Sequence, residues 1–319
     1  MKAAVVGANG VEIQDLPKPE PKADQVLIRV RAASLNRADL GIAAGMRHGS
    51  IARIGSECSG EVEAVGGAVT GIKPGDRVMS SAPGGYAEYV ATDMGRVHRM
   101  PANNMTFEQA ACYPVALHTM HNAVITAGRM KKDESVLIQG ASSGVGLMGM
   151  QVAKLMGASV VMGSSTDQGR RARLKEYGCD VAIDTTDAAW PEKVKAATGG
   201  KGVDLIVDQV SAGVANQNLD ACAVLGRIVN VGRLGGNNGE FNFDLHALKR
   251  IDYIGVTFRT RSREEVHEIN RLMRVDLWDA VEAGKLTLPI DKTFPLEKVV
   301  DALAMMKANQ HFGKIVLTV

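Results

Sequence analysis

The spacing of apolar and polar positions divides the chain into stretches with different structural character. Up to about residue 100, short apolar runs alternate with polar positions and are separated by Gly and Pro. Half-buried strands show this alternation, because successive side chains of a strand point to opposite faces of the sheet. The runs lie at 1–6, 11–14, 26–32, 61–66, 75–79 and 84–90. Closely spaced strands of this kind predict a compact, barrel-like β domain.

Helical spacing appears from residue 106. The segments 107–112 and 116–127 read as helices, with Pro114 as an interruption and Gly128 at the end of the second one. Beyond them, apolar runs of strand length alternate with segments of helical length. The six runs lie at 135–138, 159–162, 181–183, 203–207, 227–231 and 251–256. Such an alternation predicts an α/β fold with a doubly wound parallel sheet and crossover helices.

The alternation stops after residue 256. A helix rich in Glu and Arg is predicted at 262–283, a strand at 285–290, a short helix at 296–306 and a final strand at 313–319. This mixed tail does not continue the parallel sheet.

A glycine-rich turn joins the first strand of the α/β part to its first helix. Gly144, Gly146 and Gly149 have the spacing G-x-G-x-x-G. The first glycines let the backbone turn sharply and approach a pyrophosphate, and the last permits close helix–strand packing. The helix N-terminus adds free N–H groups and a partial positive charge. An ordinary glycine-rich turn can show the same spacing, but the run at 159–162 supplies the second strand of a βαβ unit. We therefore predict a dinucleotide-binding turn.

Composition limits the classes of function. With 319 residues the chain is long enough for two domains, and 45% hydrophobic and 23% charged residues are typical of a soluble globular protein. A net charge of +2 favours neither a nucleic-acid surface nor a membrane surface. No apolar run approaches the length of a membrane span and no signal-peptide pattern follows Met1, so a cytoplasmic protein is expected.

The cysteines are scattered. Cys58, Cys112, Cys179 and Cys222 form no C-x-x-C pair. A disulfide framework and a zinc ribbon are therefore not expected, and each cysteine is predicted to be a small buried hydrophobe.

Several segments together resemble one family. They lie at 33–40, 55–66, 71–78, 255–261, 294–297 and 311–316. They are similar to the zinc-free, ζ-crystallin-like quinone oxidoreductase branch of the medium-chain dehydrogenase/reductase superfamily. The resemblance implies a GroES-like, β-rich catalytic domain at 1–118, completed by 257–319. It also implies an NADP-binding Rossmann domain at 119–256.

The resemblance also bears on metal binding. Zinc-dependent relatives carry a Cys ligand at the position of Asn36, a His ligand at Ser56 and a second Cys near Val115. None of these three residues is a credible zinc ligand, and the cysteines of a structural zinc lobe are missing as well. We therefore expect no metal. Without a Lewis acid, simple alcohol oxidation is not expected either.

The end of the second parallel strand indicates which cofactor binds. NAD-selective sites place a carboxylate there, whereas this strand ends in Ser164 and Ser165, which fit a 2′-phosphate. Arg170 lies where the family carries a basic residue for this phosphate. Arg170 and the arginines that follow it also fit a solvated helix face, and the carboxylate of Asp167 is an alternative partner for NAD. We predict NADPH.

Further cofactor contacts are implied by the resemblance. At the pyrophosphate and nicotinamide ends they are Thr119, Ser143, Gly144, Val145, Gly146, Gly232, Arg233, Leu234, Phe258, Arg259 and Asn309.

The chemistry implied is hydride transfer from the nicotinamide to a quinone or to the β-carbon of an activated alkene, followed by a proton. The tyrosine that many relatives place after the segment 36–39 is missing. His48 is a candidate proton donor, unless it is simply solvated, and Arg47 is a candidate to stabilise a developing anion. Asn36 and Asp39 are expected to shape the pocket, the first by hydrogen bonding and the second by fixing the loop.

The sequence thus predicts a zinc-independent NADPH-dependent oxidoreductase acting on a quinone or an activated carbonyl compound. Two alternatives stay open, namely an enoyl or enone reductase and a low-turnover cofactor-binding structural or RNA-binding relative. No nucleic-acid or membrane partner is expected. By analogy with the family, a homodimer would form through the edge of the parallel sheet, at 251–256.

Overall fold

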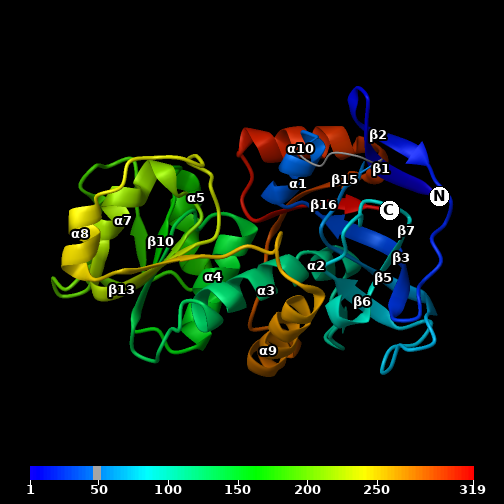
Figure 1. Ribbon diagram of the computed structural model, residues 1–319, viewed down its shortest axis with the longest axis horizontal. Helices are drawn as coiled ribbons and strands as arrows, with labels where there is room; N and C mark the ends of the chain where they lie inside the picture. The colour runs from blue at the N-terminus through cyan, green and yellow to red at the C-terminus, as the bar shows by residue number, and fades with distance from the viewer. Residues whose placement is uncertain (46–51) are drawn as a thin grey trace. The chain divides into compact units, whose positions relative to one another are not determined.

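The computed structural model describes residues 1–45 and 52–319 and divides the chain into two compact units (Figure 1). The first unit joins Met1–Val115 to Val266–Val319, and the second is Ala116–Glu265. The C-terminal tail thus belongs to the same unit as the N-terminal part. The expected domain boundaries, after residues 118 and 256, stay predictions about independently folding parts.

The first unit is built on two sheets. The larger has the strand order β15-β16-β3-β5-β6-β8, with β7 paired to β3, and the smaller has the order β2-β1-β4. The strands are β1 Lys2–Gly7, β2 Gly10–Asp15, β3 Gln25–Ser34, β4 Ala52–Arg53, β5 Cys58–Val65, β6 Arg77–Ser80, β7 Tyr89–Asp93, β8 Val97–Arg99, β15 Ile290–Pro295 and β16 Lys314–Thr318. The helices are α1 Arg37–Ala43, α2 Phe107–Ala111, α9 Arg263–Glu282 and α10 Val299–Ala308.

The tail is part of the larger sheet. β16 pairs antiparallel with β3 and parallel with β15. The strand expected at 285–290 is wrong, because β15 begins only at Ile290. Leu286 and Leu288 are buried and the intervening Thr287 is exposed, which imitates a strand pattern, but Pro289 has no amide hydrogen to donate to a ladder.

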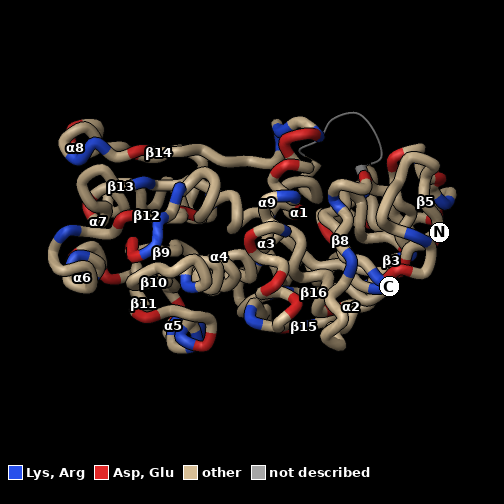
Figure 2. The backbone as a smooth tube through the Cα atoms, turned by 90° about the horizontal axis from the view of Figure 1, so that it is seen from below, with Lys and Arg blue, Asp and Glu red and all other residues tan. Residues whose placement is uncertain are grey.

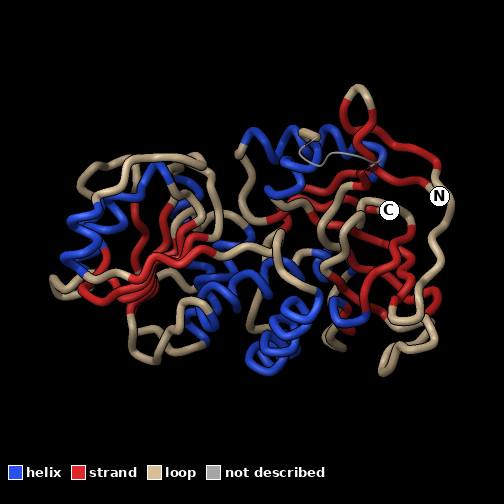
Figure 3. Tube along the Cα trace, viewed as in Figure 1, coloured by secondary structure: helices blue, strands red, loops and turns tan. Residues whose placement is uncertain are grey.

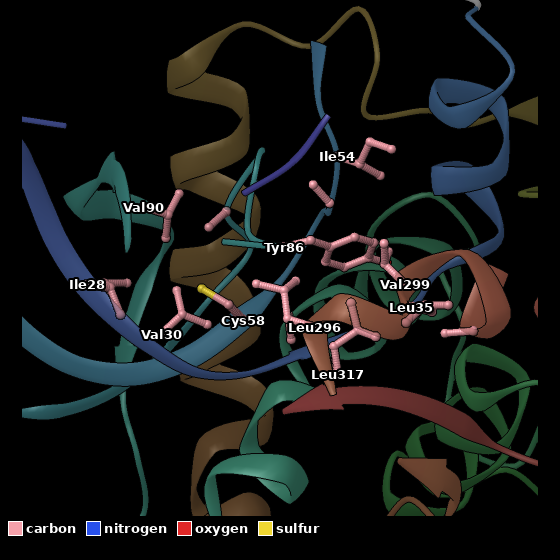
Figure 4. Packing of buried hydrophobic residues seen from close by; sticks show 14 of the residues in the cluster. Ile28, Val30, Leu35, Ile54, Cys58, Tyr86, Val90, Leu296, Val299 and Leu317 are labelled. Carbon is pink, nitrogen blue, oxygen red and sulfur yellow. The ribbon is translucent and has the colours of Figure 1, made fainter. Parts of the chain in front are cut away.

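An apolar core fixes the ends of β3 and β16 in the first unit. Tyr86 and Leu35 lie beside Val299 of α10 and Leu317 of β16 (Figure 4). The amide of Leu35 also donates to the carbonyl of Ile315 at 2.9 Å. The backbone that leads from β3 into α1 is therefore held firmly against β16.

The second unit has the predicted doubly wound sheet. Its strands are all parallel and have the order β11-β10-β9-β12-β13-β14. Figure 3 shows them as a central band with helices beside it. The strands are β9 Ser135–Ile138, β10 Val160–Ser164, β11 Val181–Ile183, β12 Val203–Asp208, β13 Cys222–Asn230 and β14 Asp252–Gly255. The helices are α3 Pro114–His121, α4 Gly144–Leu155, α5 Gln168–Arg173, α6 Trp190–Ala197, α7 Ala215–Ala221 and α8 Phe243–Lys249.

The two helices expected on either side of Pro114 are present as α2 and α3, but Pro114 begins α3 and does not lie between them. Proline suits the first helical position, since its missing amide hydrogen would have no partner there in any case. The helix continues as a π-helical turn over Asn122–Thr126.

Basic and acidic residues are interspersed along the backbone (Figure 2). Cys58, Cys112, Cys179 and Cys222 are all free and buried, as predicted. Among residues 1–45 and 52–319, no helix is both long and apolar enough to cross a membrane.

Candidate active site and cofactor site

The glycine turn connects β9 to α4 in the second unit. Ser143 is the N-cap of α4, and its hydroxyl accepts a hydrogen bond from the amide of Gly146 at 3.0 Å. Gly140 has a φ of +69°, which favours glycine. A Cβ atom at Gly146 would lie 2.7 Å from the Cα of Ala141, so this close turn also requires glycine. The predicted residues Ser143, Gly144, Val145 and Gly146 thus form the first turn of α4.

Gly149 lies on the buried side of α4. A Cβ atom there would lie 2.8 Å from the sulfur of Met120 and 3.4 Å from a methyl group of Ile138. The third glycine therefore lets α4 pack closely on α3 and β9, as the motif requires.

Ser164 and Ser165, at the end of β10, border this turn. The Ser164 side chain is only 2% exposed, and its hydroxyl accepts from the amide of Gly140 at 3.0 Å while donating to Oε1 of Gln139 at 2.5 Å. The hydroxyl of Ser165 lies 3.4 Å from that of Ser142. Ser164 thus faces into the unit, and its expected contact with a phosphate stays a prediction.

Asp167 is the N-cap of α5. Its Oδ1 accepts from the amide of Arg170 at 2.7 Å and lies 3.7 Å from that residue's Nε. This backbone hydrogen bond is the largest cause that lowers the pKa of the Asp167 carboxyl group. The carboxylate considered as a partner for NAD therefore caps a helix.

The arginines of α5 differ in their surroundings. Arg171 donates to the carbonyl of Ser165 at 2.8 Å and pairs with Asp184 at 2.8 Å, so it fastens the end of β10. The side chains of Arg170 and Arg171 are each 18% exposed, whereas that of Arg173 is 46% exposed. Only Arg173 fits the description of a solvated helix face.

The loop after β13 lies against the glycine turn. The amide of Leu234 donates to the carbonyl of Gln209 at 3.1 Å, and that of Gly232 donates to the carbonyl of Asp208 at 3.2 Å. A Cβ atom at Gly140 would lie 3.6 Å from a methyl carbon of Leu234. The structure therefore brings together the predicted residues Gly232, Arg233 and Leu234 and the turn.

Phe258 returns to α3 within the second unit. Its ring stacks on His118, with centroids 4.2 Å apart and planes inclined by 21°. Thr119, the next residue of α3, is half-buried, and Arg259 is exposed. The stack gives Phe258 a fixed place beside the helix that carries Thr119.

The first unit contains a buried polar network around Asn36. The ammonium group of Lys314 donates to Oδ1 of Asn36 at 2.9 Å and to Oε1 of Glu57 at 2.8 Å. The side-chain Nδ2 of Asn36 donates to Oε1 of Glu57 at 2.8 Å and to the hydroxyl of Ser56 at 3.0 Å. The other oxygen of Glu57 accepts from the amide of Val115 at 2.8 Å. The side chains of Asn36 and Ser56 and the backbone amide of Val115, which stand at the positions of the zinc ligands, are thus all held in hydrogen bonds.

Asp39 holds the start of α1. Its Oδ2 accepts from the backbone amide of Asn36 at 2.8 Å, from the hydroxyl of Tyr86 at 2.6 Å and from the hydroxyl of Ser56 at 3.3 Å. The carboxyl group is fully buried, and this desolvation raises its pKa to about 6 against the opposing effect of the hydrogen bonds. Asp39 is well placed to fix the loop.

Three other predicted residues lie away from these clusters or outside the described part of the chain. Arg47 and His48 lie outside the described residues. Asn309 belongs to the first unit, where it ends α10 with a φ of +55° and accepts from the guanidinium group of Arg37 at 2.7 Å. Its expected contact with the cofactor stays a prediction.

The donor set in the first unit does not fit zinc. Over the described parts of the chain, no three His, Cys, Asp or Glu side chains are grouped to hold a metal ion. The ammonium group of Lys314 already supplies a positive charge to Glu57, and amide and hydroxyl groups stand in place of thiolate and imidazole.

Comparison with known proteins gives the family. Residues 22–102 match the alcohol dehydrogenase GroES-like domain, and residues 144–274 match the zinc-binding dehydrogenase domain. The quinone oxidoreductase of Pongo abelii is 32% identical over 95% of this chain and 92% of its own length. The chain belongs to the quinone oxidoreductase family. The expectation of a medium-chain dehydrogenase/reductase fold, and of an oxidoreductase, is thereby confirmed.

Solved structures of this superfamily cover the whole chain. A mycobacterial protein complexed with NADPH has a TM-score of 0.90 at 27% identity, with all of both chains covered. An NAD-dependent alcohol dehydrogenase has a TM-score of 0.87 at 29% identity, again with all of both chains covered. The choice between the two cofactors therefore depends on the residues of this chain.

Sequence patterns did not predict the pairing of Glu57 with Lys314, nor the support that Gln139 and Asp208 give to the turn. One signal was present for Lys314, because a lysine beside the apolar run of a final strand has to find a buried partner. No comparable signal pointed to Gln139, whose partners come from distant segments.

Proposed function

We propose that this protein is a zinc-independent oxidoreductase that uses NADPH to reduce a quinone or an activated carbonyl compound. The family and the NADPH complex of the mycobacterial relative support the proposal. The single observation that carries the choice of cofactor is the engagement of Asp167. Oδ1 of its carboxylate caps α5, and Ser164 and Ser165 stand at the end of β10, where an NAD-selective site would carry an acidic residue for the ribose.

The residues of the second unit fit such a cofactor. The first turn of α4 would hold the pyrophosphate through its amides and the helix dipole, with Ser143, Gly144, Val145 and Gly146 at the contact. Ser165 and Arg170 would receive the 2′-phosphate, because a guanidinium group pairs strongly with phosphate. When bound, NADPH supplies the hydride. The rest of the cofactor would be oriented by further residues of the second unit, namely Thr119, Gly232, Arg233, Leu234, Phe258 and Arg259.

Zinc independence is proposed from the network of the first unit. Lys314 is 2% exposed and Glu57 is fully buried, so their pair forms a permanent part of the fold. Asn36 is held by this pair and would present its edge to a substrate, while Asp39 keeps the loop in place. Arg47 and His48 keep their proposed parts, one in stabilising an anion and the other in donating a proton.

A homodimer is proposed through the edge strand β14. In the parallel sheet β14 stands at the end of the strand order, so one of its edges has no partner strand among residues 1–45 and 52–319. Phe243 is 76% exposed, and the ring of Phe241 lies 5.0 Å from Phe243 and 5.5 Å from Tyr253. An open edge beside an exposed aromatic group fits a second copy that extends the sheet.

The test compares electron acceptors. Oxidation of NADPH and NADH would be followed by loss of the absorbance of the reduced nicotinamide, with a benzoquinone, an enone and an enoyl thioester as acceptors. Preference for the quinone with NADPH supports the proposal, and preference for the enoyl thioester would instead identify an enoyl reductase. Binding of NADPH without turnover of any acceptor would favour the low-turnover relative.

A further inference from the structure

A chain of hydrogen bonds runs from the glycine turn to the carboxylate of Asp208. The amide of Gly140 donates to Ser164 at 3.0 Å, and the hydroxyl of Ser164 donates to Oε1 of Gln139 at 2.5 Å. Nε2 of Gln139 donates to Oδ1 of Asn218 at 2.8 Å, and Nδ2 of Asn218 donates to Oδ2 of Asp208 at 3.1 Å. At every step the donor lies on the side of the turn and the acceptor on the side of Asp208.

These side chains are closed off from water. Gln139, Asn218 and Asp208 are fully buried, and Ser164 is 2% exposed. The second oxygen of Asp208 accepts from the amides of Val210 at 2.8 Å and Ser211 at 2.9 Å. In such surroundings aligned hydrogen bonds polarise one another, and a group left without its partner is costly. The negative charge at one end therefore decides which way the amides of Gln139 and Asn218 point.

The segment around Asp208 also supports the loop after β13, which carries Gly232 and Leu234. Nε2 of Gln209 donates to the carbonyl of Gln139 at 3.0 Å, and its Oε1 lies 3.2 Å from the hydroxyl of Ser143. The backbone carbonyls of Asp208 and Gln209 accept from the amides of Gly232 and Leu234. The end of β12 is thus joined both to the turn before α4 and to the loop after β13.

We propose that Asp208 is a positioning residue for the cofactor. Through Asn218, Gln139 and Ser164 it fixes the conformation of the turn that would hold the pyrophosphate, although its own carboxylate lies at the far end of the chain of hydrogen bonds. This inference rests on the proposed function. Because the pyrophosphate is common to both cofactors, loss of this chain of hydrogen bonds weakens the binding of NADPH and of NADH by the same factor.

An exchange of the last two side chains, those of Asn218 and Asp208, tests this chain of hydrogen bonds. In Asp208→Asn two amide groups face each other, and in Asn218→Asp two carboxylates do so. In the double variant Asp208→Asn with Asn218→Asp, the carboxylate at position 218 accepts from Gln139 and from the amide at position 208, whose carbonyl still accepts from Val210 and Ser211. The pairing is restored with its ends exchanged.

Dissociation constants for NADPH and NADH would be measured by fluorescence titration of the wild-type protein and these three variants. We expect each single variant to bind both cofactors about tenfold more weakly, and the double variant to recover most of this loss. The control is Asp220→Asn, on the same helix α7 as Asn218. Asp220 pairs with Lys195 and takes no part in the chain of hydrogen bonds, so this variant should bind both cofactors as the wild type does.

Three results would overturn the inference: single variants that bind as the wild type does, a double variant no better than the weaker single one, or a loss confined to NADPH. A wild-type protein that binds neither cofactor would refute the proposed function itself. If Asp208→Asn does not fold, Ser164→Ala takes its place. An equal loss for both cofactors then supports a positioning role, and a loss for NADPH alone shows direct binding of the 2′-phosphate and contradicts it.

Discussion

The ammonium group of Lys314 lies 2.8 Å from the carboxylate of Glu57, and both side chains are buried in the first unit. Removing one partner leaves an uncompensated charge in the interior, which costs about 3–5 kcal/mol. We therefore expect Lys314→Met and Glu57→Gln each to lower the free energy of unfolding by about this amount in urea titrations. The double variant should lose much less than the sum of the two.

A matched control for this pair is Lys2→Met, because Lys2 and Glu297 form an ion pair with side chains 48% and 53% exposed. Such exposed pairs contribute little to the free energy of unfolding, because water screens both charges. Single variants at Lys314 and Glu57 that cost no more than the control would show that the buried pair does not stabilise the fold.

Asp39 predicts a dependence of stability on pH. Burial raises its pKa from 3.8 to about 6, so between these values the folded state binds more protons than the unfolded state. The stabilising contribution of the protonated group is full below the lower value and is lost as the pH rises through the upper one. Asp39→Asn, which does not titrate, should gain up to about 3 kcal/mol of relative stability over this window.

The measurement compares urea midpoints of the wild-type protein and Asp39→Asn at several pH values. Within the described part of the chain, Tyr86 and Glu57 are the other titratable groups that act on this carboxyl group, and both are left unchanged. A difference between the two proteins that stays constant over the window would contradict a raised pKa at Asp39.

Arg170 predicts selectivity for NADPH. Loss of a charge-assisted hydrogen bond to the 2′-phosphate should raise the KM for NADPH about tenfold or more in Arg170→Ala. The KM for NADH, which lacks this phosphate, should hardly change. Arg173→Ala on the same helix is the control, since that side chain is 46% exposed and pairs with Glu176. Equal effects of Arg170→Ala on both cofactors would exclude the phosphate role.

The edge of β14 predicts how the dimer is broken. The amide of Val256 donates to Asn230 of β13, and residues alternate along a strand, so the amide of Gly255 faces the open edge. Gly255→Pro removes this donor at an edge, where proline is tolerated. It should convert a dimer to a monomer in light scattering, whereas Gly255→Ala, whose Cβ meets nothing within 4 Å, should leave the dimer intact. A monomeric wild-type protein would disprove the proposed assembly.

Local patterns were enough to predict much of the fold. The six parallel strands and the glycine turn follow from short stretches of sequence, and Gly149 has the packing role that its place in the motif implies. The two wrong predictions also come from local patterns, and both concern a proline. Pro114 starts a helix because the first helical position needs no amide, and 285–290 imitates a strand although Pro289 cannot join a ladder.

The internal connections of the site were beyond such patterns. Glu57 and Lys314 meet only because β16 joins β3 at the end of the chain, across 257 positions of sequence. Ser164 was expected at a phosphate for its size and hydroxyl group, yet its hydrogen bonds are made to Gly140 and Gln139. Which way a small polar side chain points is decided by its neighbours in space.

The most direct test of the proposed function measures NADPH oxidation with a benzoquinone after the enzyme has been dialysed against a chelator. The account predicts that the quinone is reduced at an unchanged rate, and that added Zn²⁺ does not increase it, because Lys314, Glu57 and Asn36 form a complete network without metal. Loss of turnover on dialysis with recovery on addition of Zn²⁺ would contradict the central claim.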